Sequence, residues 1–149
     1  MNEQNVAKIR AFNRFYTSII GLLNKYLLDS NFTLPEVRVM YEIDSKGRIS
    51  SKDIIQNMGI DKGYLSRLLI KLQKQGIIQR TSLKEDGRVQ LIQLTPKGVK
   101  AYSELNQAAQ NQIAEILGSL PVSEQDKLVQ HFEAIQKILK NIDTNEITQ

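Results

Sequence analysis

The sequence predicts a mainly α-helical protein that carries one small β-hairpin. Apolar residues recur at intervals of three and four along most of the 149-residue chain, as expected for amphipathic helices. Residues 77–81 and 88–94 instead combine branched apolar side chains with a polar, Gly-containing loop between them, the pattern of two strands joined by a turn. Because the length fits one domain, we expect a single domain over residues 1–149.

The first two helices are predicted from apolar spacing and capping residues. Apolar side chains spaced three and four apart mark one face of a long helix over residues 8–28, which the polar run 29–31 ends. A second helix begins at Thr33, where Glu36 is placed to complete a capping box, and it stops before the polar turn 44–47.

Two shorter helices follow. The capping signal at 50–53 begins one of them, and Gly59 is placed to end it in a left-handed conformation. Asp61 caps the next helix, which ends at Gly76. Two helices joined by such a turn form a helix-turn-helix, although a plain helical hairpin has the same pattern. The strand pair at 77–94 comes directly afterwards, where the wing of a winged helix lies.

The C-terminal third predicts two long amphipathic helices within residues 96–142, separated by Gly118 and Pro121. Their apolar faces pack either within the chain or against a second copy of it. Amphipathicity alone does not choose between these arrangements.

The composition provides few of the side chains that catalysis or metal binding requires. The absence of cysteine excludes disulfides, thiolate metal sites and thiol redox switches, and the single histidine, His131, excludes a multi-histidine metal site within one chain. No nucleophile–base set or phosphate-cradling glycine loop is evident. We expect neither an enzyme nor a cofactor nor a metal. Without an apolar run near ~18 residues or a signal peptide, we expect a cytoplasmic protein with no membrane partner.

The net charge of +4 is unevenly distributed along the chain. Residues 51–100 carry ten basic and four acidic side chains, a net +6, whereas residues 101–149 carry three and seven, a net −4. A basic central segment is typical of a phosphate-binding surface, because neutralising backbone phosphates supplies most non-specific affinity for nucleic acid. A solvated lysine-rich face has the same composition.

Three short motifs stand out in the central part of the chain: GYLSRLL at 63–69, DGR at 86–88 and LTPKG at 94–98. Together they resemble the MarR family of bacterial transcriptional regulators, and the resemblance spans nearly the whole chain. It implies a winged helix-turn-helix lobe at 33–95 between dimerisation helices at 8–28 and 96–142.

A narrower resemblance concerns residues 9–16 and 61–67. These segments are similar to the MarR-like half of proteins fused to a GNAT-type N-acetyltransferase. We expect the regulator without the transferase.

Most of the predicted DNA contacts lie on the second helix of the helix-turn-helix. The others lie in the capping signal that begins its first helix and in the wing. The predicted contacts are Ser51, Lys62, Gly63, Tyr64, Ser66, Arg67, Ile70, Lys71, Lys84, Asp86 and Arg88. A helix N-terminus attracts phosphate, and an apolar side chain such as Ile70 suits a thymine methyl. The resemblance implies that Asp86 braces the wing and that Arg88 enters the minor groove.

Structural roles are the alternatives for several of these residues. Arg67 is also suited to an ion pair with an acidic neighbour, Tyr64 to a partly buried position, and Asp86 with Arg88 to a local surface pair. Gly87 stands where many family members carry a second arginine, which weakens the expected wing contact.

The resemblance further implies a homodimer, which requires a palindromic operator. The predicted interface residues are Ile9, Phe12, Leu128, Phe132, Ile135 and Leu139. A small aromatic or anionic effector is expected at Phe12, Arg14, Tyr16 and Tyr41, although an aromatic stripe is also typical of a core. His131 fits a surface or interface position, with a pH or ligand switch as the alternative.

The sequence therefore predicts a homodimeric repressor that binds double-stranded DNA and is released by a small effector. The alternative is a winged-helix module that acts through protein contacts, such as a stand-alone partner of a separate acetyltransferase.

Overall fold

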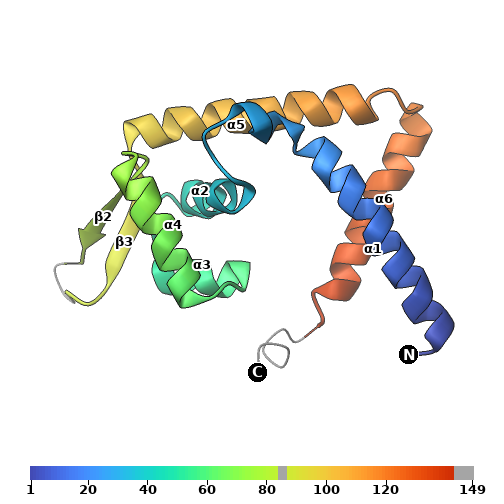
Figure 1. Ribbon diagram of the computed structural model, residues 1–149, viewed down its shortest axis with the longest axis horizontal. Coiled ribbons are helices and arrows are strands. Elements are labelled where there is room, and N and C mark those ends of the chain that lie inside the picture. Colours follow the sequence, from blue (N-terminus) through green and yellow to red (C-terminus); the bar gives the residue numbers. More distant parts are fainter. Residues whose placement is uncertain (84–86, 143–149) are drawn as a thin grey trace. The chain divides into compact units, whose positions relative to one another are not determined.

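The computed structural model describes residues 1–83 and 87–142, so the predicted contacts Lys84 and Asp86 lie outside the described residues. The protein is mostly helical with one small antiparallel sheet, which confirms the predicted fold class (Figure 1). It divides into two compact units, residues 1–112 and the residues from 113 onward, and each is described by itself. No helix within the described ranges is long and apolar enough to span a bilayer.

The helices and strands follow one another in a simple order. They are α1 (Glu3–Leu23), the 3-10 helix η1 (Lys25–Asp29), α2 (Leu34–Lys46), β1 (Ile49–Ser50), α3 (Ser51–Met58), α4 (Lys62–Lys74), β2 (Ile78–Ser82), β3 (Gln90–Leu94), α5 (Pro96–Leu117) and α6 (Val122–Leu139).

The first helix differs from its prediction at both ends. It starts at Glu3, where the Asn2 side chain accepts the Asn5 N–H at 2.8 Å, and it ends at Leu23 instead of continuing to residue 28. In a continuous α-helix the Tyr26 N–H would donate to a carbonyl four residues earlier. It donates instead to the Gln112 side-chain oxygen at 2.7 Å, and the chain tightens into η1. A residue 86 positions away thus ends the helix, which local spacing could not predict.

The predicted caps of the next three helices are confirmed. Thr33 and Glu36 form a capping box at the start of α2. Gly59 ends α3 with φ +62° and ψ +37°, a left-handed conformation that glycine adopts without a steric penalty. Asp61 caps α4 by accepting the Tyr64 N–H at 3.0 Å.

The sheet has the strand order β1-β3-β2, and both pairings are antiparallel. Strands β2 and β3 form the predicted hairpin, shifted by one or two residues at its ends. Strand β1 was not predicted, because two residues are too few to show an alternating pattern. Ile49 of β1 lies opposite Ile92 of β3 and is buried.

Among the described residues, one hydrophobic core joins α2, α3, α4 and the sheet, and Leu105 of α5 packs into it. Its buried apolar residues are Val39, Met40, Ile43, Ile49, Ile54, Leu65, Leu68, Leu69, Leu72, Ile77, Ile78, Ile92 and Leu105. All except Leu105 lie between residues 39 and 92. We call residues 33–95 the lobe.

The second unit contains the last turns of α5 and all of α6. As predicted, the two helices separate at the glycine and proline: α5 ends at Leu117 and α6 begins after Pro121. The Gln125 side chain donates to the Leu120 carbonyl at 2.7 Å across this turn. No residue of α6 is buried.

Candidate nucleic-acid interface

The first turns of α4 present an exposed, polar surface. Lys62, Gly63, Ser66 and Arg67 are all exposed, whereas Leu65 between them is buried in the core. The buried leucines of α4 recur three and four residues apart and hold one side of the helix against the core, so the opposite side of the helix faces solvent. The sequence-predicted contacts at the start of α4 therefore share one accessible side.

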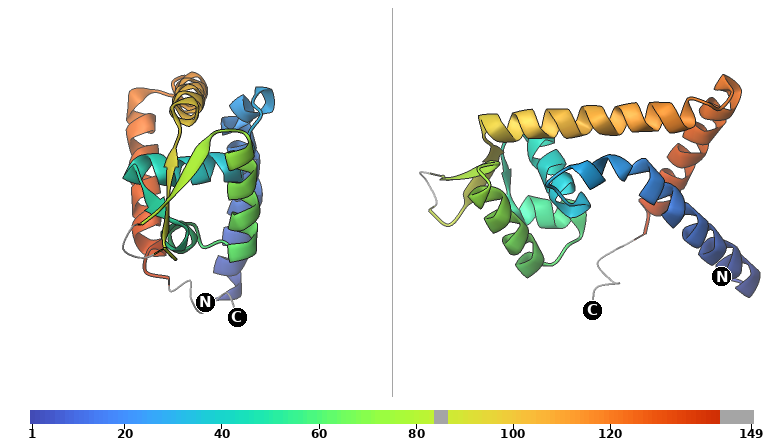
Figure 2. Two further views of the ribbon diagram at one scale, coloured as in Figure 1. Left: turned by 90° about the vertical axis from the view of Figure 1, so that its left-hand side faces the viewer. Right: turned by 45° about the horizontal axis from the view of Figure 1, so that its top comes forward.

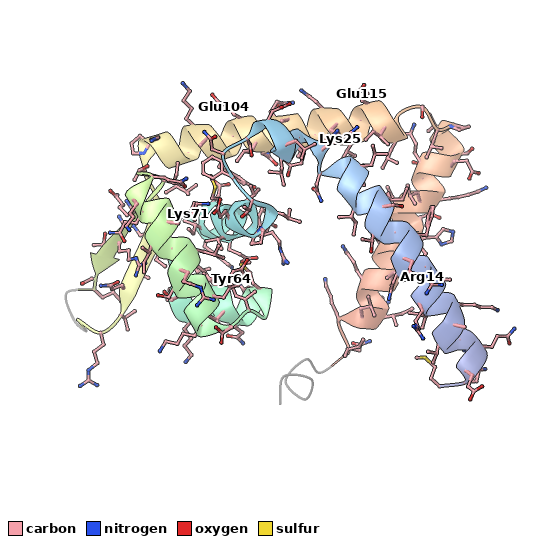
Figure 3. The ribbon with its side chains drawn as sticks, viewed as in Figure 1. Arg14, Lys25, Tyr64, Lys71, Glu104 and Glu115 are labelled. Carbon is pink, nitrogen blue, oxygen red and sulfur yellow. The ribbon has the colours of Figure 1, made fainter. Side chains whose placement is uncertain are left out.

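Arg67 and Tyr64 contact each other on this surface. The guanidinium carbon of Arg67 lies 5.8 Å from the centre of the Tyr64 ring, a cation–π arrangement. Gly63 leaves room beside them, because a Cβ at this position would come within 3.1 Å of the Asp61 carboxylate and 3.7 Å of Arg67 Nη1. The ring of Tyr64, near the start of α4 (Figure 3), thus supports the guanidinium of Arg67.

A cationic depression of about 500 Å³ lies between α3, α4 and β2. Its lining residues are Ser51, Lys52, Ile55, Lys62, Leu65, Ser66, Leu69 and Arg80. The depression brings together the predicted contacts Ser51, Lys62 and Ser66. It also contains three basic side chains and two hydroxyls, which are suitable donors for phosphate oxygens.

Two of these basic residues, Lys52 and Arg80, were not among the contacts predicted from the sequence. Arg80 follows the buried Ile78 by two positions, so the alternation of a strand could have placed its side chain on the inner face of β2. Its Nε is buried without a hydrogen-bond partner among the described residues. An anion in the depression would offer such a partner.

The wing contributes Arg88, which is exposed next to Gly87 on the approach to β3. The hairpin of β2 and β3 projects beside α4 (Figure 2). The predicted interaction of Asp86 with Arg88 lies outside the described residues, as does the predicted contact of Lys84.

The remaining predicted contacts lie farther along α4. Ile70 is exposed one turn after Ser66. The Lys71 ammonium instead lies 2.6 Å from the carboxylate of Glu36 on α2, so in this structure it is paired within the protein (Figure 3). DNA contact by Lys71 stays an untested prediction.

The end of α4 is held by residues of the LTPKG motif. The Thr95 hydroxyl donates to the Gly76 carbonyl, and Lys97 Nζ donates to the Gln75 carbonyl at 2.8 Å. Gly98 lies so close to the Ile77 carbonyl that any Cβ would overlap its oxygen. A cation at the last carbonyls of a helix also complements the helix dipole. The motif thus fixes the C-terminal end of α4 to the start of α5.

The predicted effector residues are not brought into one site. Phe12 stacks on Tyr16 within α1, with ring centres 5.4 Å apart, and Arg14 is exposed on the same helix. Tyr41 instead lines a hollow of about 210 Å³ between α2 and α5. Its lining residues are Tyr26, Leu34, Val37, Arg38, Tyr41, Tyr102, Leu105, Asn106 and Ala109.

Two of the phenols of this hollow, those of Tyr26 and Tyr102, have a raised pKa. Burial raises the pKa of Tyr26. The pKa of Tyr102 is raised first by burial and then by the negative charge of Asp44 and the neighbouring phenols of Tyr41 and Tyr26. With the Arg38 guanidinium, these hydroxyls give an otherwise apolar hollow several hydrogen-bond donors.

The predicted dimer residues lie on helices without a core of their own. Ile9 and Phe12 on α1 and Ile135 and Leu139 on α6 are 42–54% exposed, whereas Leu128 and Phe132 are half-buried. His131 is exposed on α6.

Sequence comparison identifies the family. The sequence model of the MarR family matches residues 32–89. The transcriptional regulator SarZ of Staphylococcus haemolyticus is 31% identical over 117 residues, which cover 78% of this chain and 78% of SarZ. The chain belongs to the MarR family. The multiple antibiotic resistance protein MarR of Salmonella typhimurium is likewise 31% identical to this chain over 86 residues, which cover 58% of the chain and 60% of the relative.

Solved structures show the same fold. A MarR family protein from Bacillus stearothermophilus matches with a TM-score of 0.79 at 18% identity, covering 95% of this chain and 99% of that one. A mutant of MarR from E. coli in complex with operator DNA matches with a TM-score of 0.73 at 22% identity, covering 89% and 95%. As a member of this family, the protein is a transcriptional regulator of the winged helix-turn-helix type.

Proposed function

We propose that this protein is a cytoplasmic, homodimeric repressor that binds a palindromic operator and leaves it when a small aromatic or anionic effector binds. The observation that carries the proposal is the cationic depression beside the exposed start of α4. A surface of this kind suits DNA, because its basic groups neutralise backbone phosphates while the adjacent helix reaches base edges.

The residues divide into two roles in this proposal. Lys52, Lys62 and Arg80 contact phosphates and set the depth at which α4 enters the major groove. Arg67 donates to a guanine, and Ile70 packs against a thymine methyl. The wing places Arg88 in the adjacent minor groove, and contacts by Ser51, Gly63, Tyr64, Ser66, Lys84 and Asp86 complete the predicted surface.

The homodimer is supported by the exposed apolar side chains of α1 and α6. Burying them against a second copy removes this area from water and contributes roughly 25 cal/mol for each Å². A two-fold dimer presents two copies of α4, which requires half-sites separated by about one helical turn of DNA.

The effector site of this proposal is the hollow lined by Tyr26, Tyr41 and Tyr102. Its phenols and Arg38 donate hydrogen bonds to a carboxylate or phenolate, and its apolar walls accept an aromatic ring. Of the residues predicted for this role from the sequence, only Tyr41 belongs to the hollow. Phe12, Arg14 and Tyr16 belong to α1.

Selection from a random-sequence pool of duplexes tests the proposal. We expect the full-length protein to enrich an inverted repeat. On a scrambled duplex, the Lys52→Ala variant should lower the slope of log K against log salt by about one. The Lys100→Ala variant, which removes an exposed charge from α5, is the matched control and should leave the slope unchanged. A pool without enrichment at low salt contradicts the proposal.

The same experiment separates the alternative function. A winged-helix module that acts through protein contacts, such as a partner of a separate acetyltransferase, predicts no preferred sequence. The narrower resemblance to regulators fused with acetyltransferases is the observation behind this alternative.

A further inference from the structure

Glu36 is the buried charged residue of the described chain, with 1% of its surface exposed. One of its carboxylate oxygens accepts the Thr33 N–H at 3.0 Å in the capping box of α2. The other lies 2.6 Å from the Lys71 ammonium on α4. One oxygen is therefore bound to the cap residue of α2, and the other is paired with a residue of α4.

The carboxylate requires its ammonium partner at a fixed place. A buried carboxylate without a counter-charge is strongly unfavourable, since its lost hydration is not replaced. The Lys71 side chain is 51% exposed, so the lysine alone has no such requirement. Any sliding of α4 along α2 that separates the two groups leaves Glu36 uncompensated.

Apolar packing between α2 and α4 does not supply this restriction by itself. Val39, Met40 and Ile43 of α2 share the core with Leu68, Leu69 and Leu72 of α4. The hydrophobic effect that holds them is non-directional. The ion pair adds a directional contact at one point of the α2–α4 boundary.

The position of Lys71 along α4 allows the ion pair to influence the orientation of the exposed start of the helix. Lys71 is one helical turn after Arg67, in the second half of α4. The C-terminal end is already held through Thr95 and Lys97. With Lys71 held as well, α4 has two anchored points behind the exposed turns that carry Lys62, Ser66 and Arg67.

We propose that Glu36 and Lys71 are positioning residues for DNA binding: the buried pair fixes α4 on α2 in the orientation that presents its first turns to DNA bases. This inference rests on the proposed function. It assigns Lys71 a role inside the protein and not a contact with a DNA phosphate.

The test measures affinity for two duplexes, the inverted repeat selected by the wild-type protein and a scrambled duplex of the same composition. In the Lys71→Met variant the ratio of the two affinities should fall about tenfold or more, because misplaced base contacts lose specificity. The slope of log K against log salt on the scrambled duplex should stay unchanged, because no phosphate contact is lost. Lys71→Arg retains a cation and should restore most of the ratio.

Two further variants separate positioning from folding. The double variant Glu36→Gln/Lys71→Met removes both charges, so it leaves no uncompensated carboxylate, and it should unfold near the wild-type temperature while its affinity ratio stays low. Lys74→Met removes an exposed charge from the last turn of α4 and should behave as the wild type.

Three results overturn the inference. A slope lowered by about one with an unchanged ratio identifies Lys71 as a phosphate contact. A wild-type ratio in the folded double variant makes the pair dispensable for positioning. A wild-type pool without enrichment overturns the proposed function and the positioning role with it, whereas the first two results leave the proposed function intact.

Discussion

The lobe and the terminal helices differ in how they bury apolar surface. The lobe holds nearly all of the buried apolar residues, from Val39 to Ile92. Helices α1 and α6 contain no buried residue, although their apolar side chains also recur at helical spacing. The same pattern therefore has two outcomes. In the lobe it builds a core within one chain, and on the terminal helices it leaves faces that a partner can cover.

The largest expected difference between the two regions is in the effect of removing a leucine. Leu72→Ala, in the core, should lower the free energy of unfolding by about 2–5 kcal/mol, because it opens a cavity. Leu139→Ala, 54% exposed on α6, should instead alter the dependence of the unfolding temperature on protein concentration. Urea and thermal denaturation measure both. Equal, concentration-independent losses would contradict the distinction.

Two glycines give the next comparison. Gly98→Ala places a Cβ against the Ile77 carbonyl and should cost about 1–3 kcal/mol, because α5 must move away from the end of α4. Gly21→Ala in α1 has open space around its Cβ and should stabilise the helix by roughly 0.5–1 kcal/mol. The two substitutions should change the free energy of unfolding, measured by urea denaturation, in opposite directions. A stabilised Gly98→Ala variant would contradict the close packing of α5 against the C-terminal end of α4.

A third prediction concerns the partner of the terminal helices. Phe12→Ser should raise the dimer dissociation constant about tenfold, since it removes an aromatic side chain from the predicted interface. Sedimentation equilibrium measures the constant. Leu83→Ser is the control, because Leu83 is 42% exposed but lies directly after β2, outside the predicted dimerisation helices. Equal effects of the two variants would argue against the predicted surface.

The smallest expected effect is a pH dependence within the hollow. The pKa values of Tyr26 and Tyr102 are raised in the folded state, so their contribution to stability is complete below the unfolded value of 10.0 and declines as the pH rises through the folded values. Tyr26→Phe/Tyr102→Phe should flatten the alkaline decline of the unfolding free energy. A decline as steep as in the wild type would mean that other groups cause it.

Local signals predicted the lobe well, because its helices are capped by their own neighbours. Thr33, Gly59 and Asp61 each act within a few residues of themselves. The features that were missed depend on distant partners. Strand β1 exists through its pairing with β3, and α1 ends because Gln112 captures the Tyr26 N–H.

In the candidate site, too, the residues that could be predicted depend on local sequence, and those that could not depend on distant partners. The start of α4 could be predicted, since its helix phase separates exposed Ser66 and Arg67 from buried Leu65. Arg80 joins Lys52 and Lys62 only through the packing of β2 against α4. The pairing of Lys71 with Glu36 joins residues 35 positions apart in two helices, which charge patterning along one helix does not reveal.

The end of α1 has one more consequence. The predicted α-helix continues to residue 28, yet the chain forms the 3-10 helix Lys25–Asp29, so this segment is compatible with two conformations. The Gln112 amide selects one of them by accepting a single N–H. The direction in which the chain leaves α1 therefore depends on a residue of α5. A substitution of Gln112 would change the conformation of residues 25–29, although none of these residues would itself be altered.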